Sequence, residues 1–245
     1  MLSLPTEIIT EIAYFLEPKQ RTKLREVNMI LNKLFSDRQS WRDINNEFTR
    51  NKFQKMCKIG NLYSAQWLTQ HFNLTQENAR SDSNCSLRSS CKRGHLEVAQ
   101  WLTKTFNLTQ EDARSSDNYA LQASCRNGHL EVAQWLTKTF NLTQEDARSN
   151  NNYALRWSCR NGHLEVAQWL TKAFNLTQED ARSIDNYALQ ASCQNGHLKV
   201  AQWLTQNFNL TQEDVRSDNN FALRISYKNG HTHIIEWLKN TFNIS

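Results

Sequence analysis

The sequence predicts an all-α protein, an α-solenoid of about six 34-residue repeats preceded by a small domain of three short helices. The first observation is that every glycine recurs at intervals of 34 residues. The glycines are Gly60, Gly94, Gly128, Gly162, Gly196 and Gly230. The second is that the chain holds only two prolines, and so few turn residues exclude a fold built from tight β-hairpins.

The period divides the chain after residue 50. Residues 1–50 share neither the period nor its motifs, and they form the predicted N-terminal domain. Residues 51–245 form the repeat domain. We expect its units to span residues 51–84, 85–118, 119–152, 153–186, 187–220 and 221–245, the last being cut short.

The unit at 119–152 illustrates the helices expected in each repeat. A first helix should cover about 120–127 and end at Gly128, because a left-handed residue is favourable only for glycine. A second helix should begin near Leu130. Its apolar residues share one helical face and should be buried. They are Val132, Ala133, Leu136 and Phe140.

A third, short helix should complete each unit in place of a strand. Thr143 is suited to cap it, because a threonine side chain accepts a hydrogen bond from a free amide of the first turn. Glu145 and Asp146 fall in that first turn, where the helix dipole favours carboxylates.

The recurring string Asn-Gly-His-Leu-Glu-Val-Ala-Gln-Trp-Leu resembles ankyrin repeats, over residues 51–245. Two features depart from the family: Tyr119-Ala120-Leu121-Gln122 replaces Thr-Pro-Leu-His, and a helical extension, Thr-Gln-Glu-Asp-Ala-Arg-Ser, replaces the β-hairpin. Units of this kind are similar to the ankyrin-like arrays of large amoeba-infecting viruses and protists. Tetratricopeptide arrays, which also repeat every 34 residues or so, carry a proline that these units lack.

The resemblance implies a protein-binding surface on the side of the first helices, which is concave in ankyrin-like folds. The residue at the position of Trp157 varies from repeat to repeat. The position before it, that of Arg156, alternates between glutamine and arginine. We expect Arg156, Trp157 and Arg160 to contact a partner protein, since tryptophan and arginine are enriched among binding anchors. The alternative is that Trp157 packs between repeats.

No residue pattern predicts catalysis, and we expect a non-enzyme with no cofactor and no metal. A column of five histidines and a column of five cysteines follow the period. Stacked repeats place neighbouring members too far apart to share a zinc ion or form a disulfide. We interpret the histidines as rings that bond to backbone and the cysteines as buried packing residues in a reducing compartment. Cys85 alone lies off the period and has no evident partner.

Residues 1–50 resemble the F-box, a short helical motif. The resemblance rests on Leu4-Pro5-Thr6-Glu7-Ile8, on Leu16-Glu17-Pro18, on Val27 and on a closing Trp41. Arg21 and Leu31 depart from the motif. The alternative is that this segment only caps the solenoid, because arrays require capping units.

The F-box resemblance implies an adaptor that docks on the Skp-family linker of a cullin–RING ubiquitin ligase while the repeats hold a protein substrate. It assigns the docking surface to five residues. They are Leu4, Pro5, Ile8, Ile12 and Leu16. The alternative function is a stand-alone ankyrin-type scaffold. We expect a monomer in the cytoplasm or nucleus, or in the host-cell cytoplasm if the source is viral.

Charge and hydropathy argue against other partners. The net charge is +5, and the individual 34-residue units carry between −1 and +2, with no run of like charge, so we expect no nucleic-acid binding. No apolar run approaches the roughly 18 residues that a membrane span needs, so we expect no membrane partner.

Overall fold

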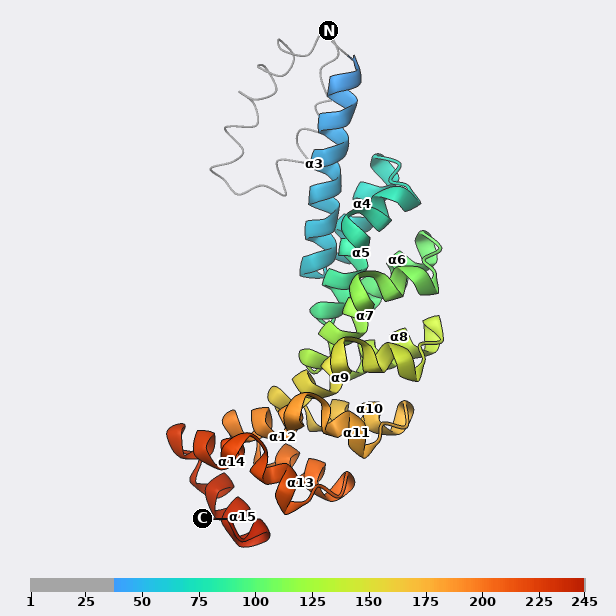
Figure 1. Cartoon of the computed structure of the whole chain (residues 1–245). Helices are drawn as coiled ribbons and strands as arrows, with labels where there is room; N and C mark the ends of the chain where they lie inside the picture. The colour runs from blue at the N-terminus through green and yellow to red at the C-terminus, as the bar shows by residue number, and fades with distance from the viewer. Residues whose placement is uncertain (1–37, 245) are drawn as a thin grey trace. The chain divides into compact units, whose positions relative to one another are not determined.

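The structure, a computed structural model, describes residues 38–244. Every regular element in this range is an α-helix, and no strand occurs in it (Figure 1). The predicted all-α repeat fold is therefore confirmed. None of the helices described is long and apolar enough to cross a membrane. The chain divides into two compact units, residues 1–51 and 52–245.

The first described helix, α3 (Arg38–Ile59), runs without a break through the boundary expected after residue 50. The N-terminal helices expected before it lie outside the described residues. The helices that follow are α4 (Leu62–His71), α5 (Gln76–Lys92), α6 (Leu96–Thr105), α7 (Gln110–Arg126), α8 (Leu130–Phe140), α9 (Gln144–Arg160), α10 (Leu164–Ala173), α11 (Gln178–Ala181), α12 (Ser183–Gln194), α13 (Leu198–Asn207), α14 (Gln212–Lys228) and α15 (Thr232–Phe242).

Each repeat joins its first and second helices through a glycine turn, as predicted. Gly128 has a φ of +77°, and the following His129 amide donates to the Ser124 carbonyl at 2.9 Å. The second helix then begins at Leu130. Because this turn recurs after every first helix, successive helix pairs stack in order along the chain (Figure 1).

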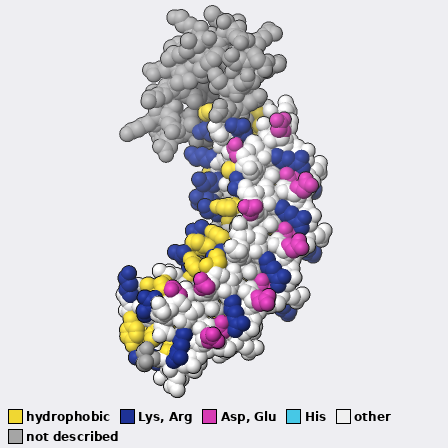
Figure 2. All heavy atoms as spheres, in the orientation of Figure 1, with side chains coloured by type: hydrophobic (Ala, Val, Ile, Leu, Met, Phe, Trp, Pro, Cys, Tyr) yellow, Lys and Arg dark blue, Asp and Glu magenta, His cyan; other side chains and the backbone are white. Residues whose placement is uncertain are grey.

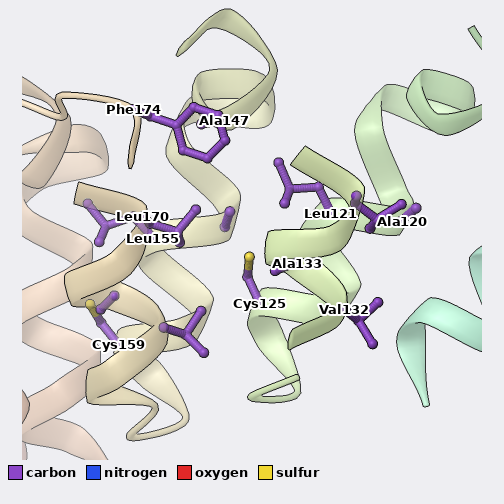
Figure 3. Packing of buried hydrophobic residues seen from close by; sticks show 14 of the residues in the cluster. Ala120, Leu121, Cys125, Val132, Ala133, Ala147, Leu155, Cys159, Leu170 and Phe174 are labelled. Carbon is purple, nitrogen blue, oxygen red and sulfur yellow. The ribbon is translucent and has the colours of Figure 1, made fainter. Parts of the chain in front are cut away.

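The apolar face expected on this second helix forms the core. Its four predicted residues are no more than 4% exposed. Figure 3 shows Val132 and Ala133 from α8 near Leu121 and Cys125 from the first helix of the same repeat. All four of these residues belong to one cluster of buried side chains that continues from repeat to repeat. Burying a leucine or valine side chain contributes roughly 1.5–3 kcal/mol, so the shared core is the main stabilising term.

The third helix is capped as predicted. The Thr143 amide donates to the Asp146 carboxylate at 2.7 Å, and Thr143 and Asp146 form a capping box. Asp146 is buried, which by itself would raise its pKa. Hydrogen bonds from Arg114 and from Thr143 outweigh burial and hold the pKa of Asp146 below its ordinary value. The carboxylate therefore stays charged at neutral pH.

A ladder of arginine–aspartate pairs links the third helices, and the sequence analysis did not foresee it. Arg114 donates from Nε and Nη2 to the two carboxylate oxygens of Asp146, each at 2.8 Å. The same bidentate pair recurs between successive repeats. The other pairs are Arg80–Asp112, Arg148–Asp180 and Arg182–Asp214. Each aspartate thus caps its own helix and binds the preceding repeat at once.

A left-handed turn separates the third helix of one repeat from the first helix of the next. In α7 the residues Ser116, Asp117 and Asn118 have φ values of 54°, 56° and 61°. Short polar residues tolerate this region best, since their side chains bond locally to the backbone. Asparagine, aspartate and serine occupy nearly all such positions, and the exception is Ile184, with a φ of 53°.

The histidine column packs against the glycine column. A Cβ added to Gly128 would lie 2.7 Å from the Nδ1 atom of His163 in the next repeat. The rings also bond to backbone, as interpreted from the sequence: Nε2 of His95 lies 3.2 Å from the Lys58 carbonyl oxygen. Burial lowers the pKa of His163, although a backbone hydrogen bond at Arg126 opposes the shift. Position 128 therefore requires glycine for two reasons: its φ is positive, and a Cβ there would collide with the His163 ring.

Replacing Ile184 with asparagine should raise the free energy of unfolding by about 1 kcal/mol, because a β-branched residue is strained at positive φ. The reciprocal change Asn150→Ile, at the matching position of the preceding repeat, should lower it by a similar amount. Urea unfolding of both variants measures the two effects. If neither Ile184→Asn nor Asn150→Ile changed the free energy of unfolding, Ile184 would not be strained.

Replacing Gly128 with alanine should destabilise the array more than the same change at Gly230. Both sites have positive φ, and this alone costs about 1 kcal/mol for alanine. Only the Cβ at position 128 meets a histidine ring, whereas nothing lies within 4 Å of one at position 230. Urea unfolding should show the difference, and a His163→Ala background should remove it. Equal effects in that background and in the wild type would refute the ring contact.

Candidate functional site

The first helices of the repeats carry basic side chains and no acidic ones. The first helices lie within residues 52–59, 85–92, 119–126, 153–160, 187–194 and 221–228, and we call the surface they form the first-helix face. These segments contain no aspartate or glutamate. Their basic residues are Lys52, Lys55, Lys58, Arg88, Lys92, Arg126, Arg156, Arg160, Arg224 and Lys228.

The small net charge of each repeat conceals this separation. The aspartates and glutamates of the repeats lie in the second helices, the third helices and the left-handed turns. In Figure 2, dark-blue and yellow side chains gather along one edge, whereas magenta side chains alternate with blue ones across the rest of the visible surface. The positive potential is therefore concentrated on one face, although the chain as a whole is only weakly basic.

Trp157 lies at the centre of this face. It is half-buried, and its ring stacks on that of Tyr153 with centroids 5.3 Å apart. The guanidinium carbons of Arg126 and Arg160 lie 4.3 and 4.4 Å from the centroid of the Trp157 ring. Cation–π contacts of this kind contribute roughly 0.5–1 kcal/mol each at exposed sites. The structure therefore brings Trp157 and Arg160 together, as the proposed partner site requires.

The same arginines connect neighbouring repeats. Arg126 donates to the Tyr153 hydroxyl at 3.1 Å, and Arg160 donates to the Tyr187 hydroxyl at 2.8 Å. Each arginine is thus fixed by the ring of the following repeat. These contacts hold the cations and aromatic rings of the first-helix face in a defined arrangement before any partner arrives.

Arg156 differs from the expectation, because it does not present its guanidinium to a partner. Only 8% of its surface is exposed. Its Nε donates to the Asn151 carbonyl at 2.6 Å, and its Nη2 donates to the Asn150 carbonyl at 3.0 Å. Burial lowers the pKa of Arg156. Its role is to bind the left-handed turn that precedes its own helix.

The position of Arg156 alternates between glutamine and arginine along the repeats because either side chain can bind the carbonyls of the left-handed turn. Gln122 and Gln190 donate to the Asp117 and Asp185 carbonyls at 2.6 and 2.8 Å. Arg88 and Arg224 donate in the same way, to Ser83 at 2.6 Å and to Asn219 at 2.8 Å. The column therefore follows a requirement of the turn and does not report on partner choice.

Sequence analysis also missed a cavity on the first-helix face. It measures about 200 Å³ and is lined by residues from α3, α5 and α7. Lys58, Arg88, Lys92 and Arg93 contribute to its walls, with Cys85. The signal in the sequence was that Cys85 lies off the period of the other cysteines.

The remaining columns fill structural positions. The five periodic cysteines are free and buried, as interpreted from the sequence. Burial raises the pKa of Cys159 to about 12, so its thiol is unreactive at neutral pH. Within residues 38–244 no group of three or more histidine, cysteine or acidic side chains is placed to hold a metal ion.

The five residues assigned to the F-box docking surface lie outside the described residues. They are Leu4, Pro5, Ile8, Ile12 and Leu16. Trp41, which closes the motif, falls inside α3.

Comparison with known proteins supports the repeat assignment. Residues 91–180 match the family model of ankyrin repeats, with three copies. This segment is similar to ankyrin repeats. The match implies a scaffold for protein–protein interaction, and such all-helical repeats are typically non-enzymatic. No curated protein matches the chain.

Replacing Trp157 with alanine should lower the free energy of unfolding by no more than about 2 kcal/mol, because stacking and cation–π contacts at a partly buried surface ring are individually weak. The matching residues Ala123 and Ala191 show that the helix accepts alanine there. The control Trp169→Ala removes a ring that packs on the core and lies 5.8 Å from Phe174, and should lower it by about 3 kcal/mol or more. Urea unfolding compares the two variants. An equal loss would make Trp157 a packing residue.

Proposed function

We propose that this chain is an adaptor of a cullin–RING ubiquitin ligase, in which residues 1–50 dock on the Skp-family linker and the repeats hold a protein substrate. The observation that carries the proposal is the order of its parts. An F-box-like motif, from Leu4-Pro5 to Trp41, precedes a repeat array whose first-helix face is basic and aromatic. An adaptor needs one surface for the ligase and a separate one for the substrate.

The substrate surface in this proposal is the first-helix face around Trp157 and Arg160. Arg126 shares in it, because its guanidinium lies against the Trp157 ring. Arg156 supports the surface from below through the turn. A partly buried tryptophan between two arginines has the composition of a binding hot spot. The uniform sign of the charge favours an acidic substrate segment.

A stand-alone scaffold is the second candidate, and one observation favours it. Helix α3 continues through residue 50 to Ile59, within the first repeat. A segment that only caps the array would be continuous with it in this way. In that case the chain binds a partner without recruiting a ligase.

The experiment that separates the two functions is capture of the purified Skp-family linker by the full chain. Wild type should bind the linker. The double variant Ile8→Asp, Ile12→Asp should lose it, because an F-box presents these apolar side chains to the linker. The matched variant Thr6→Asp, Thr10→Asp, which adds the same charge at the same spacing on another helical face, should still bind.

Thermal unfolding followed by circular dichroism controls for the fold. An adaptor keeps the melting temperature of its repeats in both double variants, because the altered face is an interface. A cap loses stability when two charges enter its buried face. Failure of the wild type to capture the linker at micromolar concentration would refute the adaptor and leave the scaffold.

A further inference from the structure

The cavity on the first-helix face lies where the second repeat has small side chains at two positions. Cys85 stands where the following repeats have Tyr119, Tyr153, Tyr187 and Phe221. Ser89 stands where the fourth repeat has Trp157. In that repeat Tyr153 and Trp157 stack on each other, whereas here Cys85 Sγ and Ser89 Oγ lie 3.6 Å apart. Two small side chains therefore leave open the space that rings fill elsewhere.

The walls of this cavity are cationic. Lys58, Arg88, Lys92 and Arg93 line it together with Cys85, Ser89 and Tyr119, and no lining residue is acidic. Arg93 is peculiar to this repeat, since the four repeats that follow have asparagine at its position. Within the described part of the chain, every ion pair uses an arginine of a third helix, so none neutralises these four groups.

One of the four cations is held in place. Arg88 donates to the Ser83 and Asp82 carbonyls at 2.6 and 2.8 Å, and its guanidinium carbon lies 5.2 Å from the centroid of the Tyr119 ring. Lys92 and Arg93 are exposed and come from the end of α5 and its C-cap. Gathering like charges around a hollow is unfavourable until an anion enters.

We propose that this cavity binds a phosphate monoester carried by a phosphorylated serine or threonine of a partner protein. A phosphate monoester carries about −1.5 to −2 charge and three acceptor oxygens, which match a site lined by four cations. Arg88 contributes mainly its charge, because its Nε and Nη2 already donate to carbonyls of the turn. A carboxylate carries one charge and would leave most of these donors unmatched. We assign the phosphate to a protein segment because the first-helix face is proposed to bind a protein, and in this respect the inference rests on the proposed function.

A nucleic acid fits the face less well. A polyanion needs cations at regular intervals along its path. The segment 187–194 contains none, because Gln194 stands where Arg126 and Arg160 stand in the two preceding repeats. The four cations line one small cavity, which matches a single phosphate better than a continuous backbone.

The test is titration of the purified full chain with a glycine-flanked phosphoserine peptide, followed by calorimetry at low ionic strength. We expect saturable binding of this peptide and about tenfold weaker binding of the glutamate and serine versions, because both lack the second charge and the third oxygen. Equal binding of the glutamate peptide would overturn the phosphate assignment. Tighter binding of an oligothymidylate that depends on Lys92 would replace it with a nucleic-acid site.

Three variants localise the site. Cys85→Tyr restores the ring of the other repeats and should abolish binding by filling the cavity. Lys92→Glu, at an exposed position, should abolish it without affecting the fold. Lys228→Glu, at the matching position of the last repeat, should bind like the wild type. Equal losses at Lys92 and Lys228 would show a diffuse field and refute a defined cavity.

Protection of a thiol gives a second readout. Cys85 is the one half-buried cysteine among the six, and the other five are buried. Alkylation of the native chain should therefore modify Cys85 first, and the phosphoserine peptide should slow it. Unslowed alkylation under saturating peptide would place the phosphate elsewhere. Neither assay contains the Skp-family linker, so loss of linker capture alone would refute the ligase role and leave the cavity proposal standing.

Discussion

Three consecutive residues at positive φ at the end of each of the five complete repeats are the constraint on which the rest of this structure depends. Left-handed backbone costs L-residues roughly 1–2 kcal/mol each, and it persists only where the surroundings fix it. Here an arginine or glutamine from the next helical turns binds the carbonyls of the turn, as Arg156 does at Asn151. This turn connects the third helix to the next first helix. The third helix stands where ankyrin repeats have a pair of strands.

That third helix supplies the polar coupling between repeats. Its aspartate caps the helix and accepts a bidentate pair from the arginine of the preceding repeat, as Asp146 does from Arg114. Hydrogen bonds to the charged form hold the pKa of these aspartates low in spite of burial. A large share of the acidic groups is thereby committed to the third helices. The first-helix face retains cations without compensating acids, which makes it suited to an acidic partner.

Because the repeats are nearly identical, positions shared by most repeats can be distinguished from positions that differ in a single repeat. Positions that serve the fold vary little: the glycine recurs in all six repeats, and a threonine with an aspartate or asparagine forms each capping box. On the first-helix face, single repeats depart from the common pattern. Trp157 adds a ring in one repeat, and Cys85 with Arg93 opens a cationic cavity in another. The proposed partner sites therefore lie where single repeats depart from the common pattern.

The sequence by itself determined the period, the glycine turn, the Thr143 cap and the buried face of the second helix. These features depend on residues within one or two helical turns of each other, where helical geometry alone sets the neighbours. Only the tertiary structure decided which arginine meets Asp146 and that Cys85 lies at an open cavity. The pairing partner of Asp146 lies 32 residues away in the chain. Such contacts depend on how one repeat stacks on the next, and the spacing within a repeat carries no information about that.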